Sequence, residues 1–360
     1  MANHSVMTMK QCASDLQGLC SKVCRSAQHS GPLYCAASLY VQGQDHVDVI
    51  ASSFDGCHRS PGNTIFSSAS ISKIIVGVAI MQCTEKGLVD LHGDISKYLP
   101  FTFRNPRYPN DPISVYMLLT HTSSLVDSES ALMKGSRFRV DGGVPNPWSL
   151  LDYTKLLISE ESSNKWSKLN PPGKVKNYSN AGFTVLGFAV ELLRGKPFHQ
   201  TVKERIFQPL GMIHSSFTLE EAKRLAKKEG DIMICRPGNY DYYEVAEYPA
   251  AQLRSTCVDL RRFLSHLCLT RQGEKSEIIS TASVLEMMPN EKTNCLAWWG
   301  VDFPYHSQSS CWEHGGFMQG IRSYAFVWES GCMCILFNGE IACFEEYVTE
   351  FMKILNPNTT

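Results

Sequence analysis

The chain contains 360 residues, of which 43% are hydrophobic and 10% aromatic, so it can bury a sizeable core and is not globally disordered. The formal net charge is -1 at pH 7 and no block of like charge stands out, which argues against a nucleic-acid or membrane-surface function. No stretch approaches the roughly 18 consecutive apolar residues of a spanning helix, and the first residues lack the apolar core of a signal peptide. We therefore expect a cytoplasmic protein.

The 14 cysteines are expected to be reduced and buried. Cys20 and Cys24 have the i, i+4 spacing of one helix face, and Cys332 and Cys334 alternate as two side chains on one face of a strand would. No pair has the CxxC spacing of zinc sites, and the chain is far longer than the small secreted scaffolds that disulfides hold together. We expect no metal and no cofactor.

The first expected elements are a helix and a hairpin. Residues 8–29 have the pattern of a polar, amphipathic helix, and residues 33–54 contain two β-rich runs around a Gly-Gln-Asp turn. A second helix is predicted over residues 70–87, with Gly87 in "TEKGLVDL" as its C-cap.

The middle of the chain favours helices. Residues 88–250 contain Pro- and Gly-rich loops between helical patterns such as 181–194 and 219–228, and strand signals are sparse. Strands return after residue 296, in "LAWWGVDF", "SYAFVWES" and "CMCILFNGE", before a last amphipathic helix in "FEEYVTEFMKIL".

This order places strands at both ends of the chain and helices between them. If the N-terminal hairpin pairs with the C-terminal strands in an antiparallel sheet, the middle becomes an inserted helical lobe. We predict a domain over residues 30–350 after an N-terminal helical extension, 1–29. Its sheet lobe would come from 30–87 and 255–360, and its helical lobe from 88–254. A cleft between two such lobes is a usual place for a ligand site.

The helix predicted over residues 70–87 begins with "SISK", in which Ser70 and Lys73 are one turn apart and share a face. The run after Lys73 is almost wholly apolar, so this helix is expected to be buried all round. A partly desolvated lysine has a lowered pKa and can take the proton of a neighbouring serine hydroxyl, while the helix N-terminus favours negative charge on a substrate oxygen. The spacing alone is a weak signal: it recurs at Ser162 and Lys165, and it more often marks a cap and a surface lysine.

The stretch "NPPGKVKNYSNAGF" places Tyr178 and Asn180 in a loop just before a helix that begins near Ala181. A loop tyrosine can reach into a cleft, and its phenolate is a candidate general base where cationic groups lower its pKa. Asn180 offers a donor and an acceptor to a substrate amide. The plainer alternative is a buried tyrosine followed by an asparagine N-cap, and Asn180 can serve in both ways.

The stretch "CWEHGGFMQG" contains His314, Gly315 and Gly316 before Phe317 and the strand predicted in "SYAFVWES". Glycines let a substrate backbone approach a strand edge, and the backbone N–H of Phe317 could form an oxyanion hole with that of Ser70. Taken alone, the stretch predicts a glycine turn with an incidental histidine.

Together, SISK at 70–73, YSN at 178–180 and HGG at 314–316 follow the motif order of the serine β-lactamase and penicillin-binding protein superfamily: S-x-x-K, then Y-x-N, then K-T-G or H-x-G. The chain most resembles its class C-like branch of esterases, D-stereospecific aminopeptidases and eukaryotic β-lactamase-like proteins. Stretches outside the motifs add to the resemblance, among them "LHGDISKYLP", "LLTHTSSL" and "QPLGMIHSSF".

The resemblance implies an α+β fold of the β-lactamase/transpeptidase type: an antiparallel sheet flanked by helices plus an inserted all-helical lobe. It implies that Ser70 is the nucleophile, Lys73 its activator, and Tyr178 the base that also protonates the leaving group. The positions that it implies for substrate binding are Asn180, His314, Gly315, Gly316 and Phe317.

The chain departs from the family pattern in places. His314 stands where K-T-G proteins have a lysine, the usual partner of a β-lactam or peptide carboxylate, and a histidine is mostly neutral at pH 7. Phe317 adds bulk beside the proposed oxyanion hole, and residues 126–170 match the family poorly, so both are expected to shape substrate choice. Ser124 stands where "HTSGL" usually has glycine, with no catalytic meaning assigned.

The leading expectation is a serine hydrolase that forms an acyl-enzyme with esters, small amides or short peptides. Its partner would then be a small-molecule or peptide substrate; no nucleic-acid or membrane partner is expected, and homo-oligomerisation is left open. The second expectation is β-lactamase or D,D-peptidase activity. The third is a non-catalytic scaffold or binding protein on the same fold.

Overall fold

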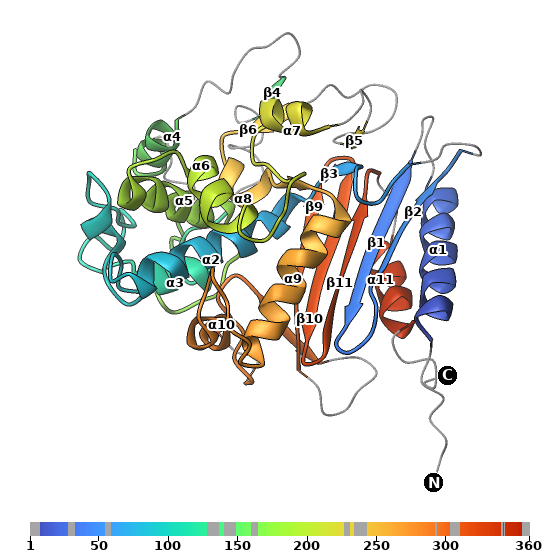
Figure 1. The fold of residues 1–360 in the computed structure, drawn as a ribbon. Coiled ribbons are helices and arrows are strands. Elements are labelled where there is room, and N and C mark those ends of the chain that lie inside the picture. Colours follow the sequence, from blue (N-terminus) through green and yellow to red (C-terminus); the bar gives the residue numbers. More distant parts are fainter. Residues whose placement is uncertain are drawn as a thin grey trace.

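An antiparallel sheet with helices on both faces stands beside a mainly helical part in the computed structural model (Figure 1). The structure describes residues 8–27, 33–54, 59–127, 137–139, 149–159, 165–226, 231–233, 243–291, 294–302, 310–339, 341 and 343–354.

The main sheet has six strands in the order β2–β1–β11–β10–β9–β8, and all neighbouring pairs are antiparallel. The N-terminal hairpin joins the C-terminal strands where Ser38 of β1 lies opposite Cys334 of β11. This pairing confirms the sheet expected from the two ends of the chain. The strands are β1 (Tyr34–Val41), β2 (Val47–Ser52), β8 (Trp299–Asp302), β9 (Ser310–Met318), β10 (Ile321–Trp328) and β11 (Gly331–Phe337).

Strand β9 contains the stretch for which a glycine turn was the plainer alternative, and that alternative is wrong. His314, Gly315 and Gly316 do not form a turn before a strand but lie inside β9. Consecutive glycines weaken a strand pattern because they have no side chain to pack. Here β10 supports them, with Gly316 directly opposite Ser323.

Two helices cover one face of the sheet. The N-terminal helix α1 (Met9–Ser26) and the C-terminal helix α11 (Phe344–Lys353) lie side by side there (Figure 1). Met333 of β11 packs in the same apolar cluster as α1, whereas Cys332 and Cys334 belong to the cluster on the opposite face. The alternation predicted for the two cysteines is therefore confirmed.

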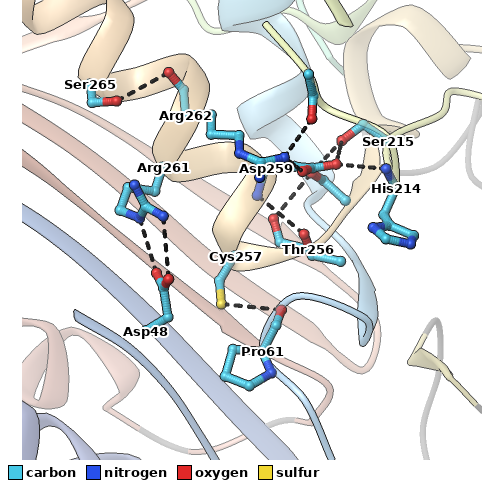
Figure 2. Close-up of polar contacts among 12 residues, drawn as sticks. Asp48, Pro61, His214, Ser215, Thr256, Cys257, Asp259, Arg261, Arg262 and Ser265 are labelled. Carbon is cyan, nitrogen blue, oxygen red and sulfur yellow. Dashed lines mark hydrogen bonds and ion pairs between the residues drawn. The ribbon is translucent and has the colours of Figure 1, made fainter. Parts of the chain in front are cut away.

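The opposite face carries α9 (Cys257–Arg271), which polar contacts tie to its surroundings (Figure 2). Asp259 in its first turn accepts hydrogen bonds from the backbone N–H of His214 at 2.7 Å and the hydroxyl of Ser215 at 3.0 Å. Arg261 donates to both carboxylate oxygens of Asp48 in β2, at 3.0 and 3.2 Å. The helix is thus fixed to the sheet and to the loop that contains His214 and Ser215.

Helix α2 (Ser72–Glu85) runs through the centre of the helical part, and every residue from Ser72 to Cys83 is buried. This confirms the helix expected to be buried all round. Gly77 permits the close packing, because a Cβ there would lie 3.0 Å from the side chains of Ala297 and Met287. The other α-helices of the described chain are α3 (Val115–Leu119), α4 (Leu150–Leu157), α5 (Asn180–Arg194), α6 (Phe198–Val202), α7 (Leu219–Leu225), α8 (Tyr248–Ala251) and α10 (Thr281–Met287).

Short elements complete the fold. They are the strands β3 (Ile65–Ser67), β4 (Arg137–Arg139), β5 (Ile232–Met233), β6 (Tyr243–Val245) and β7 (Arg254–Ser255), and the single turns η1 (Ala69–Ile71), η2 (Ile95–Tyr98) and η4 (Lys203–Phe207).

One apolar cluster extends from the sheet into the helical part, since it contains Leu336 of β11, Ile75 of α2 and Phe183 of α5. The division into a sheet lobe and a helical lobe remains a prediction. In the described part of the chain the cysteines carry no disulfide, and all but Cys343 are buried. None of the described helices has the length and apolar character needed to cross a bilayer.

Candidate active site

Ser70 lies in η1, the single turn between β3 and α2. The residue before it, Ala69, has a φ of 45°, which a residue with a side chain rarely adopts. Two contacts hold this turn in place: Ser72 Oγ donates to Ala69 O at 2.5 Å, and the N–H of Leu253 donates to Ser72 Oγ at 2.8 Å. A strained backbone that its surroundings fix in this way is common at functional sites.

Lys73 is fully buried, and its amine is surrounded by three oxygen atoms. Lys73 Nζ lies 3.1 Å from Ser70 Oγ, 2.6 Å from Asn180 Oδ1 and 2.9 Å from Ala250 O. Burial lowers the pKa of Lys73 to about 7, against the opposing effect of the Asp127 and Glu247 carboxylates. The amine is therefore substantially uncharged at neutral pH.

The three contacts fit an uncharged amine, which has two N–H groups and one lone pair. The carbonyl oxygens of Asn180 and Ala250 can only accept, so they take the two N–H groups. The lone pair then faces Ser70 Oγ, where it can accept the hydroxyl proton.

Tyr178 approaches the same serine oxygen, because its hydroxyl donates to Ser70 Oγ at 2.7 Å. Its ring stacks on His121 with 4.6 Å between centroids, and Lys73 Nζ lies 4.8 Å from the ring centroid. The expected lowering of the Tyr178 pKa is not found. Burial raises this pKa instead, and Asp127 and Glu247 add to the rise, so Tyr178 keeps its proton at neutral pH.

Asn180 is the first residue of α5 and not its N-cap. The cap is Ser179, whose hydroxyl accepts from the N–H of Gly182 at 3.1 Å. Asp127 Oδ2 accepts from both the backbone N–H and the side-chain Nδ2 of Asn180, each at 2.7 Å. With its Nδ2 engaged by Asp127, Asn180 turns its Oδ1 toward Lys73.

A conformationally unusual loop brings Asp127 to this position. Two of its residues that are not glycine have positive φ, His121 at 61° and Ser124 at 70°. This explains why glycine suits position 124 in "HTSGL". Ser124 is held by a hydrogen bond from Asn105 Nδ2 at 2.6 Å and by its own donation to Asn170 O at 2.8 Å.

The glycines of the third motif bring β9 against the turn that carries Ser70. A Cβ built on Gly316 would lie 2.2 Å from Ser323 Oγ, 2.6 Å from Ser68 O and 3.2 Å from Ser70 N. Ser323 Oγ also donates to Ser68 O at 2.8 Å. Only a glycine at position 316 allows the strand to pass this closely.

His314 is buried and neutral. Burial and the nearby Lys73 lower the pKa of His314 to about 3. Its Nδ1 lies 2.8 Å from Gly315 O, and because a carbonyl can only accept, Nδ1 carries the proton. Its Nε2 is therefore a lone-pair acceptor, and it has no hydrogen-bond partner among the described residues.

A pocket of about 360 Å³ opens onto these groups. Of the residues expected to form the site, Lys73 and Gly316 are buried and do not line this pocket. Its lining residues are Ser70, Tyr178, Asn180, Trp299, Glu313, His314, Gly315, Phe317 and Tyr324.

Sequence reasoning missed four residues around the site: Asp127, Glu247, Trp299 and Glu313. Asp127 lies two positions after the stretch "LLTHTSSL", which contributes to the family resemblance, so that stretch could have pointed to it. Burial, with a further contribution from Asp127, raises the pKa of Glu247 to about 7. Within the described residues, no group of three or more His, Cys, Asp and Glu side chains could hold a metal ion.

Two of the solved structures with a similar fold show how low the sequence identity is. The octameric penicillin-binding protein homologue from Pyrococcus abyssi superposes with a TM-score of 0.71 at 20% identity, covering 97% of this chain and 77% of that one. The D-amino acid amidase from Ochrobactrum anthropi SV3, complexed with L-phenylalanine, also gives 0.71 at 20% identity, covering 97% and 99% of the two chains. These likenesses establish the β-lactamase/transpeptidase type of fold.

Curated relatives match part of the chain. The D-alanyl-D-alanine-carboxypeptidase/endopeptidase AmpH of Escherichia coli is 28% identical over 184 residues, which are 49% of this chain and 45% of that protein. The putative penicillin-binding protein PbpX of Bacillus subtilis is 28% identical over 156 residues, or 43% and 33% of the two chains. The match thus spans less than half the length of either relative.

The broadest match is to a family model described as Beta-lactamase, which covers residues 36–330 and therefore includes all three motifs. Because this match takes in most of the chain, the protein belongs to the Beta-lactamase family.

Proposed function

We propose that this protein is a serine hydrolase that forms an acyl-enzyme with esters, small amides or short peptides. The observation that carries the proposal is the position of Ser70 Oγ, 3.1 Å from the amine of Lys73 and 2.7 Å from the hydroxyl of Tyr178. A nucleophile within hydrogen-bond reach of a base, which other groups in turn orient, is the arrangement that covalent catalysis requires. Membership of the Beta-lactamase family supports the same reading.

Lys73 is the base in the first step of the proposed reaction. Its lone pair takes the proton of the Ser70 hydroxyl while Ser70 Oγ forms a bond to the substrate carbonyl carbon. The carbonyl electron pair moves onto oxygen, where the backbone N–H groups of Ser70 and Phe317 would stabilise the negative charge.

Tyr178 is the acid that completes the transfer. As the tetrahedral intermediate collapses, the bond to the leaving group breaks and the leaving group takes the proton of the Tyr178 hydroxyl. The phenolate regains a proton from the ammonium of Lys73. Water then adds to the acyl carbonyl, the bond to Ser70 Oγ breaks, and the acid product leaves with the serine hydroxyl restored. A tyrosine with a raised pKa suits this acid role better than the resting base role that the sequence suggested.

The test is hydrolysis of a short-chain p-nitrophenyl ester by the wild type and Ser70→Ala. We expect turnover by the wild type, loss of turnover in the variant, and an added acyl mass on the intact wild-type chain after rapid quenching. Ser162→Ala is the matched control, since the same serine–lysine spacing recurs there. Normal turnover by Ser70→Ala would refute the assignment.

The partial identity with AmpH makes D,D-peptidase or β-lactamase action the second candidate. A stable penicillin adduct on Ser70 would favour it. The neutral His314 in the third motif weakens it, because a neutral imidazole holds a substrate carboxylate less strongly than an ammonium does. A scaffold role would lead only if neither ester nor penicillin reacts with Ser70.

A further inference from the structure

Glu313, the residue before the third motif, lines the same pocket as Ser70. It lies in β9 directly opposite Trp299 of β8. Alternation along the strand puts its side chain on the same face as that of Phe317. A carboxylate therefore lies on the wall of the proposed substrate site, four positions along the strand from Phe317, which also lines the pocket and is 44% exposed.

This carboxylate has no partner among the residues that the structure describes. Its side chain makes no hydrogen bond or ion pair to any residue of the described chain, and burial raises the pKa of Glu313 without an opposing cation. A partly desolvated charge without a partner is unfavourable, so a bound cation would recover free energy that the empty site lacks.

The cations nearest to this wall are engaged elsewhere. Lys176 Nζ lies 3.8 Å from the centroid of the Trp299 ring, and burial lowers its pKa, with no contribution from Glu313. Arg322 lies over the Phe317 ring at 5.3 Å and donates to the carbonyl oxygens of Met318 and Ile321. No lysine or arginine of the described residues lines the pocket.

The neighbouring His314 supplies no positive charge to this wall. Its buried Nε2 offers a lone pair with no partner among the described residues, and the imidazole is neutral. Because neighbouring residues of a strand alternate, the His314 side chain lies on the face opposite that of Glu313. Strand β9 therefore gives the pocket one carboxylate and no cationic side chain, so it cannot hold a substrate carboxylate by charge.

We propose that Glu313 is a specificity-determining residue that recognises a protonated amino group on the substrate. The site then selects esters and amides of amino acids and similar amine-bearing acids over neutral analogues, and disfavours substrates with a carboxylate at this position. This inference rests on the proposed hydrolase function, because it concerns which substrate reaches Ser70.

The experiment compares four benzyl esters, of which two carry a positive charge, one is neutral and one carries a negative charge. D- and L-alanine benzyl esters carry the ammonium, isobutyric acid benzyl ester replaces it with a methyl group, and monobenzyl succinate carries a carboxylate. Release of benzyl alcohol gives kcat/KM for the wild type, Glu313→Gln, and the exposed control Glu220→Gln on α7.

In the wild type we expect the better alanine ester to exceed the isobutyrate ester by roughly tenfold or more, as a hydrogen bond to a charged group allows. Glu313→Gln should lower this ratio by about the same factor, whereas Glu220→Gln should keep it. An unchanged ratio in Glu313→Gln, or a wild-type preference for monobenzyl succinate, would overturn the inference while leaving Ser70-dependent hydrolysis intact.

A binding measurement keeps the inference testable if no ester is turned over and the proposed function itself fails. This measurement is a calorimetric titration that gives the affinities of the wild type and of Glu313→Gln for alaninamide and for isobutyramide. Preferred binding of alaninamide that disappears in Glu313→Gln would support the recognition role. Equal binding of the two amides by the wild type would reject it.

Discussion

Lys73 shows how strongly the chemistry of a single residue depends on its surroundings. A lysine amine in water is protonated at neutral pH, but this one is fully buried and its pKa falls to about 7. The carboxylates of Asp127 and Glu247 limit the fall, because each stabilises the ammonium form. The balance leaves a base that can both accept and return a proton near neutral pH.

The opposing effects of burial and of the two carboxylates on the pKa of Lys73 predict how the rate of hydrolysis depends on pH. Hydrolysis needs Lys73 uncharged, so kcat/KM should rise with pH through a midpoint near 7. Asp127→Asn removes a charge that raises the pKa of Lys73, so the midpoint should move to lower pH. Glu247 titrates in the same range, so the midpoint belongs to the coupled pair of Lys73 and Glu247.

The measurement is kcat/KM for a neutral ester between pH 5 and 9, roughly two units on either side of the midpoint. Asp111→Asn, an exposed carboxylate in the same helical part, is the control and should keep the wild-type midpoint. A lower kcat/KM in Asp127→Asn with an unmoved midpoint would mean that Asp127 only positions Asn180.

At the scale of elements, the site depends on how closely β9 approaches η1. The approach requires a glycine at position 316, and Ser323 of β10 holds the turn through its bond to Ser68 O. Strand β8 pairs with β9 only from Ser310 to Glu313, and beyond that point the described part of β8 offers no partner. The rest of this β9 edge therefore contributes residues to the pocket.

Gly316→Ala should separate β9 from the turn that carries Ser70. The added Cβ would lie 2.6 Å from Ser68 O, so the strand or the turn must shift. Displacement of the reacting groups by about 1 Å can reduce the rate on the order of 100-fold, and we expect kcat/KM to fall by that amount. A wild-type kcat/KM in this variant would contradict the tight packing.

Gly18→Ala is the matched control for that substitution. Gly18 lies in α1, and a Cβ there would meet no atom within 4 Å. Alanine is the better helix former, so we expect about 0.5–1 kcal/mol of added stability and unchanged kcat/KM. Thermal unfolding and ester hydrolysis measure both quantities for the two variants.

At the scale of the whole molecule, two apolar clusters meet at the main sheet. One lies between the sheet and the helical part, and the other joins α1 and α11 to the opposite face. Both ends of the described chain therefore cover the same face of the sheet (Figure 1). The predicted N-terminal extension supplies buried side chains such as Leu16 and Val23 to the second cluster.

Leu16→Ala tests whether α1 is part of the stable fold. Leu16 is fully buried, so its truncation should lower the free energy of unfolding by about 2–5 kcal/mol. Ser14→Ala, on the exposed side of the same helix, should change it by less than about 0.5 kcal/mol. Urea unfolding followed by tryptophan fluorescence gives both values. Equal stabilities of the two variants would show that α1 is a detachable extension.

The local pairs of residues and the order of the elements follow from the amino-acid sequence. Ser70 and Lys73 meet because three positions make about one helical turn, and Cys332 and Cys334 share a sheet face because strands alternate. The N-terminal hairpin and the closing helix also follow from local periodicity. These features could be predicted because their geometry depends on residues close together in the chain.

The surroundings of these pairs depend on how the whole chain packs. Asn180 and Ala250, more than a hundred residues from Lys73, supply the acceptors that turn its lone pair toward Ser70. Burial, which no spacing reveals, raises the pKa of Tyr178 where the sequence suggested a fall. The strand around Gly316 exists because β10 pairs with it, and Glu313 enters the pocket for the same reason. Charge state and proximity depend on distant parts of the chain, so they become visible only when those parts are packed together.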